Sequence, residues 1–333
     1  MLAVGKQHRG QRQALSFDFF HVAPLSIAAL LDYLIGDPWG WLHPVQVMGW
    51  VIDRYTKLAF WAFKRPISLR LAGVVLTILL TVGSGMAGLC MVAITRSIHP
   101  AFGLMTESIL LASCFAGRSL RSAAEDVLQP LAAGDLDRAR SQLKLYVGRD
   151  TENLSVSEVL RAVLETVTEN ATDGVMAPLF YALLGAFIPM VGSAPLALFY
   201  KAASTLDSMV GYRDAPYTEI GWCSAKADDF LTWLPCRLTV LTLAIVSRNT
   251  REVWRICRRD AAKDPSPNSG WSECAYAAVL GVQVGGTNFY RGVAKHKPLL
   301  GDAMQPITPD RIRKALQLTR LCFLIWLGAA LLA

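Results

Sequence analysis

Residues 148–178 read GRDTENLSVSEVLRAVLETVTENATDGVMAP and hold the clearest helix signal of the chain. Ser155 and Glu158 have the S-x-x-E spacing of a capping box, which predicts a helix start at this point. Apolar residues then recur at helical spacing as far as Val167, so one face of the helix is expected to be buried. The stretch therefore predicts an amphipathic helix that leads into 175–200, a run without a charged residue.

Three acidic residues follow one another at intervals of one helical turn in this stretch: Glu165, Glu169 and Asp173. Like charges at this spacing repel one another, so helix stability alone does not favour them. Carboxylates at the edge of an apolar segment suggest Mg²⁺ or phosphate chemistry beside a membrane. The alternative is a solvated acidic face, and the local sequence does not separate the two interpretations.

The composition is typical of a membrane protein. Of the 333 residues 53% are apolar and only 18% are charged, against about 25% charged residues in soluble domains. A net charge of +7 would suit nucleic-acid binding in a soluble chain. Here the basic residues lie between apolar runs, which fits loops that face the cytoplasm and anionic lipid, so no nucleic-acid partner is expected. The seven cysteines form no C-x-x-C pair, which argues against a zinc site.

We expect an all-α, polytopic membrane protein with about four to six membrane helices, some of them broken or re-entrant. Leu71–Thr95 is uncharged and long enough to cross a bilayer, and Ser97–Gly117 would form a hairpin with it. Three prolines predict that 175–200 forms two short helices instead of one span. The other candidates are 21–35, which is short for a span, 230–247 and 316–333.

The organisation expected from these runs is a polar leader at 1–20 and a single membrane-embedded helical domain at 21–333. Residues 36–70 are expected to form a loop, and strand signals are weak throughout. Lys and Arg concentrate in two polar regions, which the positive-inside rule places in the cytoplasm. The segments expected on that side, with helical loops, are 118–174, 201–229 and 248–320.

Two polar loops have the composition of an anion site. Arg149 precedes the capped helix, where a guanidinium and a helix N-terminus can both bind a phosphate; a loop salt bridge is the alternative. Residues 264–270 read DPSPNSG and supply hydroxyl, amide and backbone donors ahead of an expected helix at 271–280. This loop is not a Walker A motif, so an ordinary structured loop stays open as well.

Further polar residues lie near the apolar runs. His43 can act as a base or a phosphate contact, or be a surface histidine. Lys201 closes the uncharged run and is expected to extend to the interface, whereas Asp207 is expected to be functional because an acid at a membrane edge is costly. The candidate substrate- or phosphate-binding residues are Arg149, Asp150, Lys201, Arg213, Asp264, Asn268, Ser269 and Asn288.

Several blocks of the sequence resemble the adenosylcobinamide-phosphate synthase family, the cobalamin biosynthesis proteins CobD and CbiB. The resemblance spans about residues 22–320. The blocks that carry it are DYLIGDPWGWLHPVQVMG (32–49), 148–178, FYKAASTLDSMVGYRDAPY (199–217), Asp228-Asp229 and DPSPNSGWSECAYAAVLGVQVGGTN (264–288).

The resemblance implies a multi-pass protein of the inner membrane whose active site faces the cytoplasm. Members of the family join adenosylcobyric acid to (R)-1-aminopropan-2-ol phosphate, or to the free amino alcohol, through an amide bond, in a reaction thought to be driven by ATP. ATP and Mg²⁺ are the cofactors expected from it. The expected partners are the corrinoid, the amino-alcohol phosphate, membrane lipid and other membrane enzymes of cobamide assembly.

With this resemblance the candidate residues take roles. Glu165, Glu169 and Asp173 are expected to hold Mg²⁺, and the expected catalytic residues are Glu165, Glu169, Asp207 and His43. Two alternatives remain. One is a membrane sensor or regulatory protein like the AmpE-like relatives of the family, in which the acids are structural. The other is a transporter with broken helices, which the long polar loops and the lack of an inverted repeat make less favoured.

Overall fold

The structure is a computed structural model that describes residues 23–36, 43–188, 190–212 and 214–332. The predicted leader at 1–20 and the candidate Arg213 lie outside the described residues. The chain forms two compact units. Unit 1 consists of the described residues up to Phe115, Pro178–Asp228 and the C-terminal end from Ile325, and unit 2 consists of Ala116–Ala177 and Asp229–Leu324.

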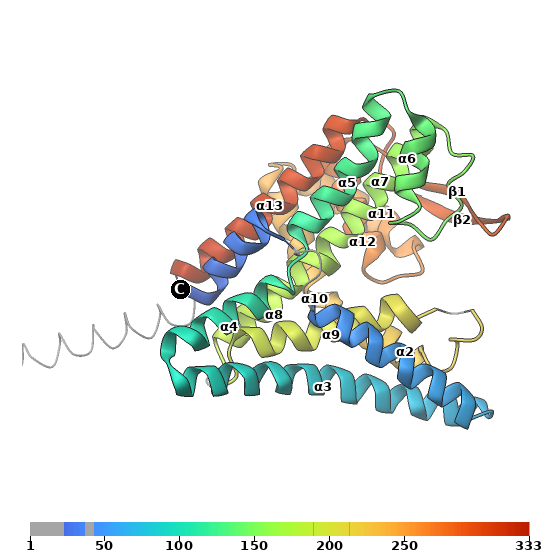
Figure 1. The fold of residues 1–333 in the computed structure, drawn as a ribbon. Helices are drawn as coiled ribbons and strands as arrows, with labels where there is room; N and C mark the ends of the chain where they lie inside the picture. The colour runs from blue at the N-terminus through green and yellow to red at the C-terminus, as the bar shows by residue number, and fades with distance from the viewer. Residues whose placement is uncertain (1–22, 37–42, 189, 213, 333) are drawn as a thin grey trace, which may run out of the picture. The chain divides into compact units, whose positions relative to one another are not determined.

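The protein is a helical, polytopic membrane protein, as its sequence predicts (Figure 1). Within the described ranges, four helical stretches are long and apolar enough to cross a bilayer: Pro66–Ile98, Pro100–Ala132, Trp222–Val246 and Pro309–Leu332. The second is interrupted at residues 113–116, between α4 (Pro100–Ala112) and α5 (Gly117–Ala132). A shorter apolar helix covers Ala23–Leu34, where the sequence predicts a segment too short for a span.

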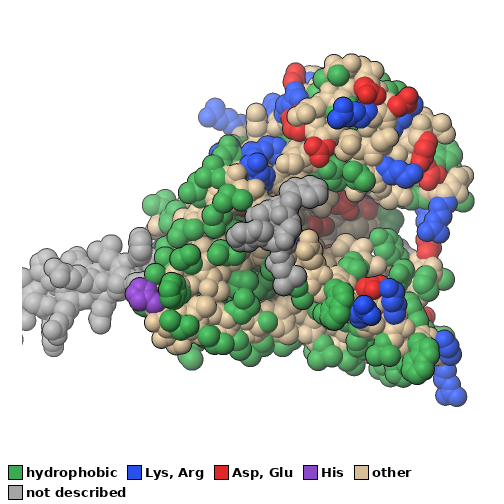
Figure 2. All heavy atoms as spheres, in the orientation of Figure 1, with side chains coloured by type: hydrophobic (Ala, Val, Ile, Leu, Met, Phe, Trp, Pro, Cys, Tyr) green, Lys and Arg blue, Asp and Glu red, His purple; other side chains and the backbone are tan. Residues whose placement is uncertain are grey.

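Unit 1 is built around α3 (Pro66–Ile98), which packs against α4 and α9 (Ser193–Val210). Small residues permit the close approach to α9: a Cβ atom on Gly88 would stand 2.6 Å from Leu198 Cδ1. The opposite face of α3 exposes large apolar side chains, which gather over this helix in Figure 2. They include Leu71, Val75, Ile78, Leu79, Val82, Met86, Met91 and Ile94.

The acid inside the second predicted span is paired. Glu107 in α4 is buried, and one of its oxygens accepts a hydrogen bond of 3.0 Å from the backbone N–H of Ser193 at the start of α9. Its other oxygen accepts one of 3.0 Å from Arg96. A buried carboxylate needs such partners, so Glu107 stabilises the packing of α3, α4 and α9.

Two expectations for unit 1 have different outcomes. The apolar run 175–200 is broken into α8 (Ala177–Ala186) and α9, as its prolines predict. The expectation of a loop at 36–70 is wrong, because Pro44–Ala62 forms helix α2. His43 is the N-cap of α2: its Nδ1 accepts from the Val45 N–H, and Gln46 completes a capping box. Pro44, at the first helical position, is favourable there.

Unit 2 combines helices with one β-hairpin. Its helices are α5, α6 (Leu136–Leu143), α7 (Val156–Asn170), α11 (Thr250–Asp260) and α12 (Ser269–Leu280), with a π-helical turn η1 (Ala171–Met176) and a 3₁₀ turn η2 (Ala261–Lys263). Helices α10 (Trp222–Val246) and α13 (Pro309–Leu332) contribute residues to both units. Unit 2 contains all of two polar segments that the sequence places in the cytoplasm, 118–174 and 248–320.

The hairpin departs from the all-helical expectation. Strands β1 (Val284–Tyr290) and β2 (Val293–Leu300) pair antiparallel, with a bulge between the pairs Val284–Leu300 and Gly286–Lys297. Gly285 lies opposite the bulge with φ +94°, and a Cβ atom there would stand 2.0 Å from the Pro298 carbonyl oxygen. Only glycine fits this conformation and this contact.

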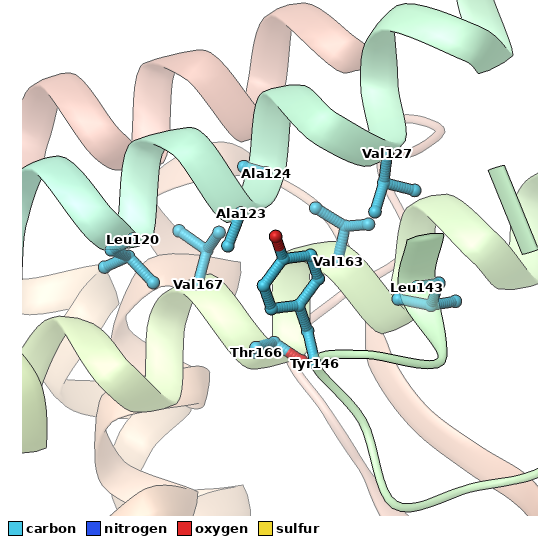
Figure 3. Close-up of a pocket in the computed structure, with 9 residues that line it drawn as sticks. All are labelled: Leu120, Ala123, Ala124, Val127, Leu143, Tyr146, Val163, Thr166 and Val167. Carbon is cyan, nitrogen blue, oxygen red and sulfur yellow. The ribbon is translucent and has the colours of Figure 1, made fainter. Parts of the chain in front are cut away.

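Helices α5, α6 and α7 pack against one another through apolar side chains. Charged side chains gather on the surface over α5 and α6 (Figure 2). Figure 3 shows Tyr146 between α5 and α7, and its hydroxyl donates to Asp126. The cavity here has a volume of about 10 Å³, which is at most enough for one water. It is lined by Leu120, Ala123, Ala124, Val127, Leu143, Tyr146, Val163, Thr166 and Val167, so it is part of the core and not a ligand pocket.

Candidate functional site

Helix α7 presents its acids toward the hairpin and α12. The predicted capping box is present, since the Ser155 N–H donates to Glu158 over 2.7 Å and Ser155 Oγ accepts from the Glu158 N–H. Downstream, the apolar side chains at Val159, Val163 and Val167 are buried. This burial fixes the rotation of the helix about its axis, so the side chains of the acidic row have a defined direction.

Glu165 lies at the centre of a buried network. The residue is 1% exposed. One oxygen accepts from Arg149 Nη2 over 2.6 Å, and the other accepts from Arg161 Nη1 over 3.2 Å and from the Gly285 N–H over 2.9 Å. Asn288 joins the same network, because its Oδ1 accepts from Arg149 over 2.8 Å and from Arg161 over 3.1 Å. We call these five residues the arginine network; it fixes β1 against α7.

A second group of charges lies beside the arginine network. Lys297 of β2 makes an ion pair of 3.1 Å with Oε1 of Glu273 in α12, whose side chain is fully buried. Glu169 of α7 is partly exposed, and no hydrogen bond or ion pair to it is found among the residues that the structure describes. We call Glu169, Glu273 and Lys297 the acid–lysine cluster.

The acids of this cluster are electrostatically strained. Burial raises the pKa of Glu273 to about 8; Lys297 opposes the rise, and Glu169 and Glu165 add to it. Burial likewise raises the pKa of Glu169, with Lys297 opposing and Asp264 and Glu165 adding. Burial alone would lower the pKa of Lys297, but the three surrounding glutamates raise it overall. The cluster therefore favours an additional positive charge or a proton.

The loop before α12 adds polar atoms to the same region. Asp264 Oδ1 accepts from the Ser266 N–H over 2.9 Å and from Ser269 Oγ over 3.4 Å. The side-chain amide of Asn268 donates to the Asp229 carbonyl oxygen over 2.9 Å. Three buried acceptor oxygens have no donor within the described ranges: Glu273 Oε2, Asp264 Oδ2 and Asn268 Oδ1. A buried polar atom is rarely left unpaired, so these oxygens indicate an additional ligand or water.

The remaining predicted residues occupy different places. Asp150 closes the hairpin turn, because its oxygens accept from the N–H groups of Arg291 over 2.9 Å and Gly292 over 2.7 Å. Asp173 lies in η1, a π-helical turn of a kind often found at functional sites. His43, Lys201 and Asp207 belong to unit 1.

The described side chains alone do not form the predicted Mg²⁺ site. Among the described residues, no group of three or more His, Cys, Asp or Glu side chains is placed to hold a metal ion. Glu165 already has partners on both oxygens. A Mg²⁺ at this edge would need most of its ligands from a substrate and water, which is usual for this ion.

Sequence reasoning missed four members of the site: Arg161, Glu273, Lys297 and Gly285, which contributes its backbone N–H. Arg161 precedes Glu165 by one helical turn, so its pairing with that acid was readable from the spacing. Glu273 lies within the block 264–288, and an acid in an otherwise apolar helix was a usable signal. Lys297 gave no local signal, because its partner comes from α12.

All of these residues lie inside a region that matches a known family. The model of the family described as CobD/Cbib protein matches residues 25–319. The chain belongs to the CobD/CbiB family. The arginine network and the acid–lysine cluster of this CobD/CbiB chain lie between Arg149 and Lys297, wholly within the match.

Curated CobD/CbiB proteins are similar over nearly the whole chain. The cobalamin biosynthesis protein CobD of Synechocystis sp. is 52% identical over 308 residues, which cover 92% of this chain and 90% of the relative. CobD of Halalkalibacterium halodurans is 40% identical, with 92% and 95% covered. The cobalamin biosynthesis protein CbiB of Salmonella typhimurium is 40% identical, with 88% and 91% covered. No solved structure matches the chain.

Proposed function

We propose that this chain acts in cobalamin biosynthesis as an ATP-dependent amide ligase. It would join adenosylcobyric acid to (R)-1-aminopropan-2-ol phosphate, or to the free amino alcohol, and release adenosylcobinamide phosphate or its unphosphorylated counterpart. Membership of the family supports the pathway. The acid–lysine cluster of unit 2 is the observation that carries the reaction class, because strained buried acids beside cationic groups are typical of active sites.

The proposed reaction has two steps. A carboxylate oxygen of the corrinoid attacks the γ-phosphorus of ATP and ADP leaves, which gives an acyl phosphate. The amine nitrogen then attacks the acyl carbon, phosphate leaves with the C–O electron pair, and the nitrogen loses a proton to a base. Such phosphoryl and acyl transfers depend mainly on positioning and on stabilisation of charge.

The residues of unit 2 suit these tasks. Lys297 and Arg149 supply positive charge beside the acids, which can stabilise phosphate groups of a substrate. Glu165 would hold Arg149 in place, since it is bound to that guanidinium on one side and to β1 on the other. The predicted bases Asp207 and His43 stay proposals and belong to unit 1.

Mg²⁺ fits this region as a partial site. Glu169 has no hydrogen bond or ion pair within the described ranges, and its raised pKa shows that a cation nearby would stabilise its charged form. Glu169 and Asp173 would hold the ion together with substrate phosphates. Glu165 would lie farther from the ion than these two acids. When bound, Mg²⁺ would neutralise the negative charge of those phosphates.

We further propose that the polar segments of unit 2 face the cytoplasm, where ATP is available, and that the helices long and apolar enough to cross a bilayer lie in the cell membrane in contact with lipid. The excess of Lys and Arg in 118–149 and 248–320 supports this orientation. Other membrane enzymes of cobamide assembly are proposed as neighbours, because a large corrinoid passes between successive steps.

The decisive experiment is an assay of the purified full-length protein in detergent. Adenosylcobyric acid, aminopropanol phosphate, ATP and Mg²⁺ are mixed with the protein, and the amide product and released phosphate are both measured. We expect product and phosphate in equal amounts. Glu169→Gln is expected to lower turnover at least a hundredfold, whereas Glu252→Gln, at an exposed ion pair of α11, is the matched control.

Two results would contradict parts of the proposal. Wild-type protein that forms no amide and consumes no ATP would favour the AmpE-like sensor or regulator. Full turnover by Glu169→Gln would remove this acid from the metal site and leave the ligase itself intact.

A further inference from the structure

We infer that the buried acceptor oxygens at the start of α12 form a binding site for a protonated primary amine. This inference rests on the proposed function for the identity of the amine, which would be the amino group of the amino-alcohol substrate. Its geometric basis is independent of that function.

The first observation is a set of buried acceptors without donors. Glu273 is 1% exposed and Asn268 is 4% exposed, yet Glu273 Oε2 and Asn268 Oδ1 have no hydrogen-bond partner within the part of the chain that the structure describes. Asp264 Oδ2 is a third buried acceptor in the same condition. The other polar atoms of these residues are used, so their side chains are held in place with one acceptor each left over.

The second observation is that these residues surround the first turns of one helix. Asn268 is the N-cap of α12. Asp264 packs on Gly270, where a Cβ atom would stand 2.5 Å from the Asp264 Cβ. Glu273 follows Gly270 by three residues and therefore lies on the same face of α12. Glu169 of α7 interacts electrostatically with both Asp264 and Glu273, which places it at the same site.

The chemistry of the atoms selects the ligand. All three unpaired atoms are acceptors, so the ligand must donate hydrogen bonds. Glu169 and Glu273 interact with the single ammonium of Lys297, and Asp264 acts on Glu169, so this group of acids favours a positive ligand. A phosphate or carboxylate is excluded by this charge. A primary ammonium group carries one positive charge and three donors, which matches the three acceptors in number.

A divalent metal fits less well. Mg²⁺ requires near-octahedral oxygen ligands at about 2.0–2.1 Å. No described cluster of three acidic, histidine or cysteine side chains has that spacing. An ammonium group tolerates the longer and more varied distances of hydrogen bonds.

The site also suits what the amine must do next. An ammonium has no lone pair, so it has to transfer one proton before the nitrogen can attack an acyl carbon. Glu273 Oε2 is an unpaired side-chain oxygen in the site, and the buried surroundings of Glu273 favour its protonated form, so a proton that leaves the ammonium can be held there. The proton would move from nitrogen to Oε2, and the nitrogen would keep the electron pair.

The test uses two small probes of nearly equal size with the full-length protein in detergent. The probes are 1-aminopropan-2-ol, which is protonated at neutral pH, and propane-1,2-diol, in which a hydroxyl replaces the ammonium. Binding is followed by calorimetry. We expect the amine to bind at least tenfold more tightly than the diol.

Variants locate the binding. Glu273→Gln is expected to weaken amine binding at least tenfold and to leave diol binding unchanged. Asn268→Asp adds a negative charge at the site and is expected to tighten amine binding. Glu252→Gln changes an exposed acid of α11 and is expected to change neither. The comparison of amine with diol on the wild-type protein requires no variant, so it holds even where a variant fails to fold.

Two outcomes would overturn the inference: equal affinity for amine and diol, or unchanged amine binding in a folded Glu273→Gln protein. Failure of the ligase is distinguishable from failure of the site. Amine binding that needs Glu273, with no amide formed from the full substrates, contradicts the ligase alone. Amide formation with an unchanged amine KM in Glu273→Gln contradicts the site alone.

Discussion

Replacing Glu165 by glutamine is expected to destabilise unit 2 strongly. The substitution keeps the size of the side chain and removes its charge, while the guanidinium groups of Arg149 and Arg161 stay nearly buried, at 8% and 14% side-chain exposure. The glutamine amide would direct N–H groups toward one of these cations. Its remaining carbonyl oxygen can serve only part of the three donors that Glu165 satisfies.

The magnitude follows from the loss of a buried partner. Hydrogen bonds to a charged group contribute about 1.5–3 kcal/mol each, and breaking a buried ion pair by removing one partner costs about 3–5 kcal/mol. At about 2 °C per kcal/mol for a chain of this size, the Tm is expected to fall by about 6–10 °C. The free energy of unfolding is measured in detergent by denaturant titration, and hydrogen exchange of the β1 amides reports unit 2 directly.

Matched variants separate the network from general effects. Glu252→Gln also removes a carboxylate from an arginine, but both partners are exposed, so it is expected to leave the Tm nearly unchanged. Adding Arg149→Met to Glu165→Gln removes one of the cations left unpaired, so the double variant is expected to lose less stability than the two single losses together. A Glu165→Gln protein within about 1 kcal/mol of wild type would refute the reasoning, because buried unpaired arginines would then carry no cost.

Three further predictions concern the same unit. The fold raises the pKa of Glu273 to about 8, above about 4.3 in the unfolded chain, so the native state binds one more proton between these pH values. The free energy of unfolding, measured by denaturant titration, should therefore fall as the pH rises from about 4.3 to about 8, and it should change less with pH in Glu273→Gln. The same pH dependence in both proteins would contradict this prediction. Gly285→Ala should lower the free energy of unfolding more than Gly134→Ala does. Both glycines have a positive φ, but only at Gly285 would the new Cβ atom clash with a neighbour, the Pro298 carbonyl. Equal losses of unfolding free energy in the two variants would show that this clash has no cost. Asp150→Ala should lower stability by about 1–3 kcal/mol and speed hydrogen exchange at the hairpin tip, and unchanged exchange there would show that its two hydrogen bonds are dispensable.

Local signals in the sequence predicted the helices well. The capping box at Ser155, the apolar run of α3 and the broken segment 175–200 all depend on neighbours within a few turns, and all three are confirmed. The helix α2 was missed because its N-cap is a histidine, which is not among the residues that usually signal a helix start. The strands were missed because their glycines and charged residues do not follow the alternation typical of strands.

The candidate site was predicted only in part, for a physical reason. Arg149 and the acidic row were found because they lie in one stretch of sequence. Their partners come from far along the chain: Asn288 lies 139 residues after Arg149, and Gly285 lies 120 residues after Glu165. Spacing along one helix indicates which residues share a face, but not which distant segment covers that face.

The pairing of β1 with its surroundings has a consequence for the behaviour of the protein outside the membrane. A strand at the edge of a sheet can pair with the same strand of another copy and start aggregation. Along the outer edge of β1, the carbonyl oxygens of Gly285 and Thr287 accept from Arg161, and that of Phe289 accepts from the Asp150 N–H. Pro298 in β2 has no N–H to offer. The hairpin therefore presents few free groups to a second copy, and the arginine network also protects the extracted protein from edge-to-edge association.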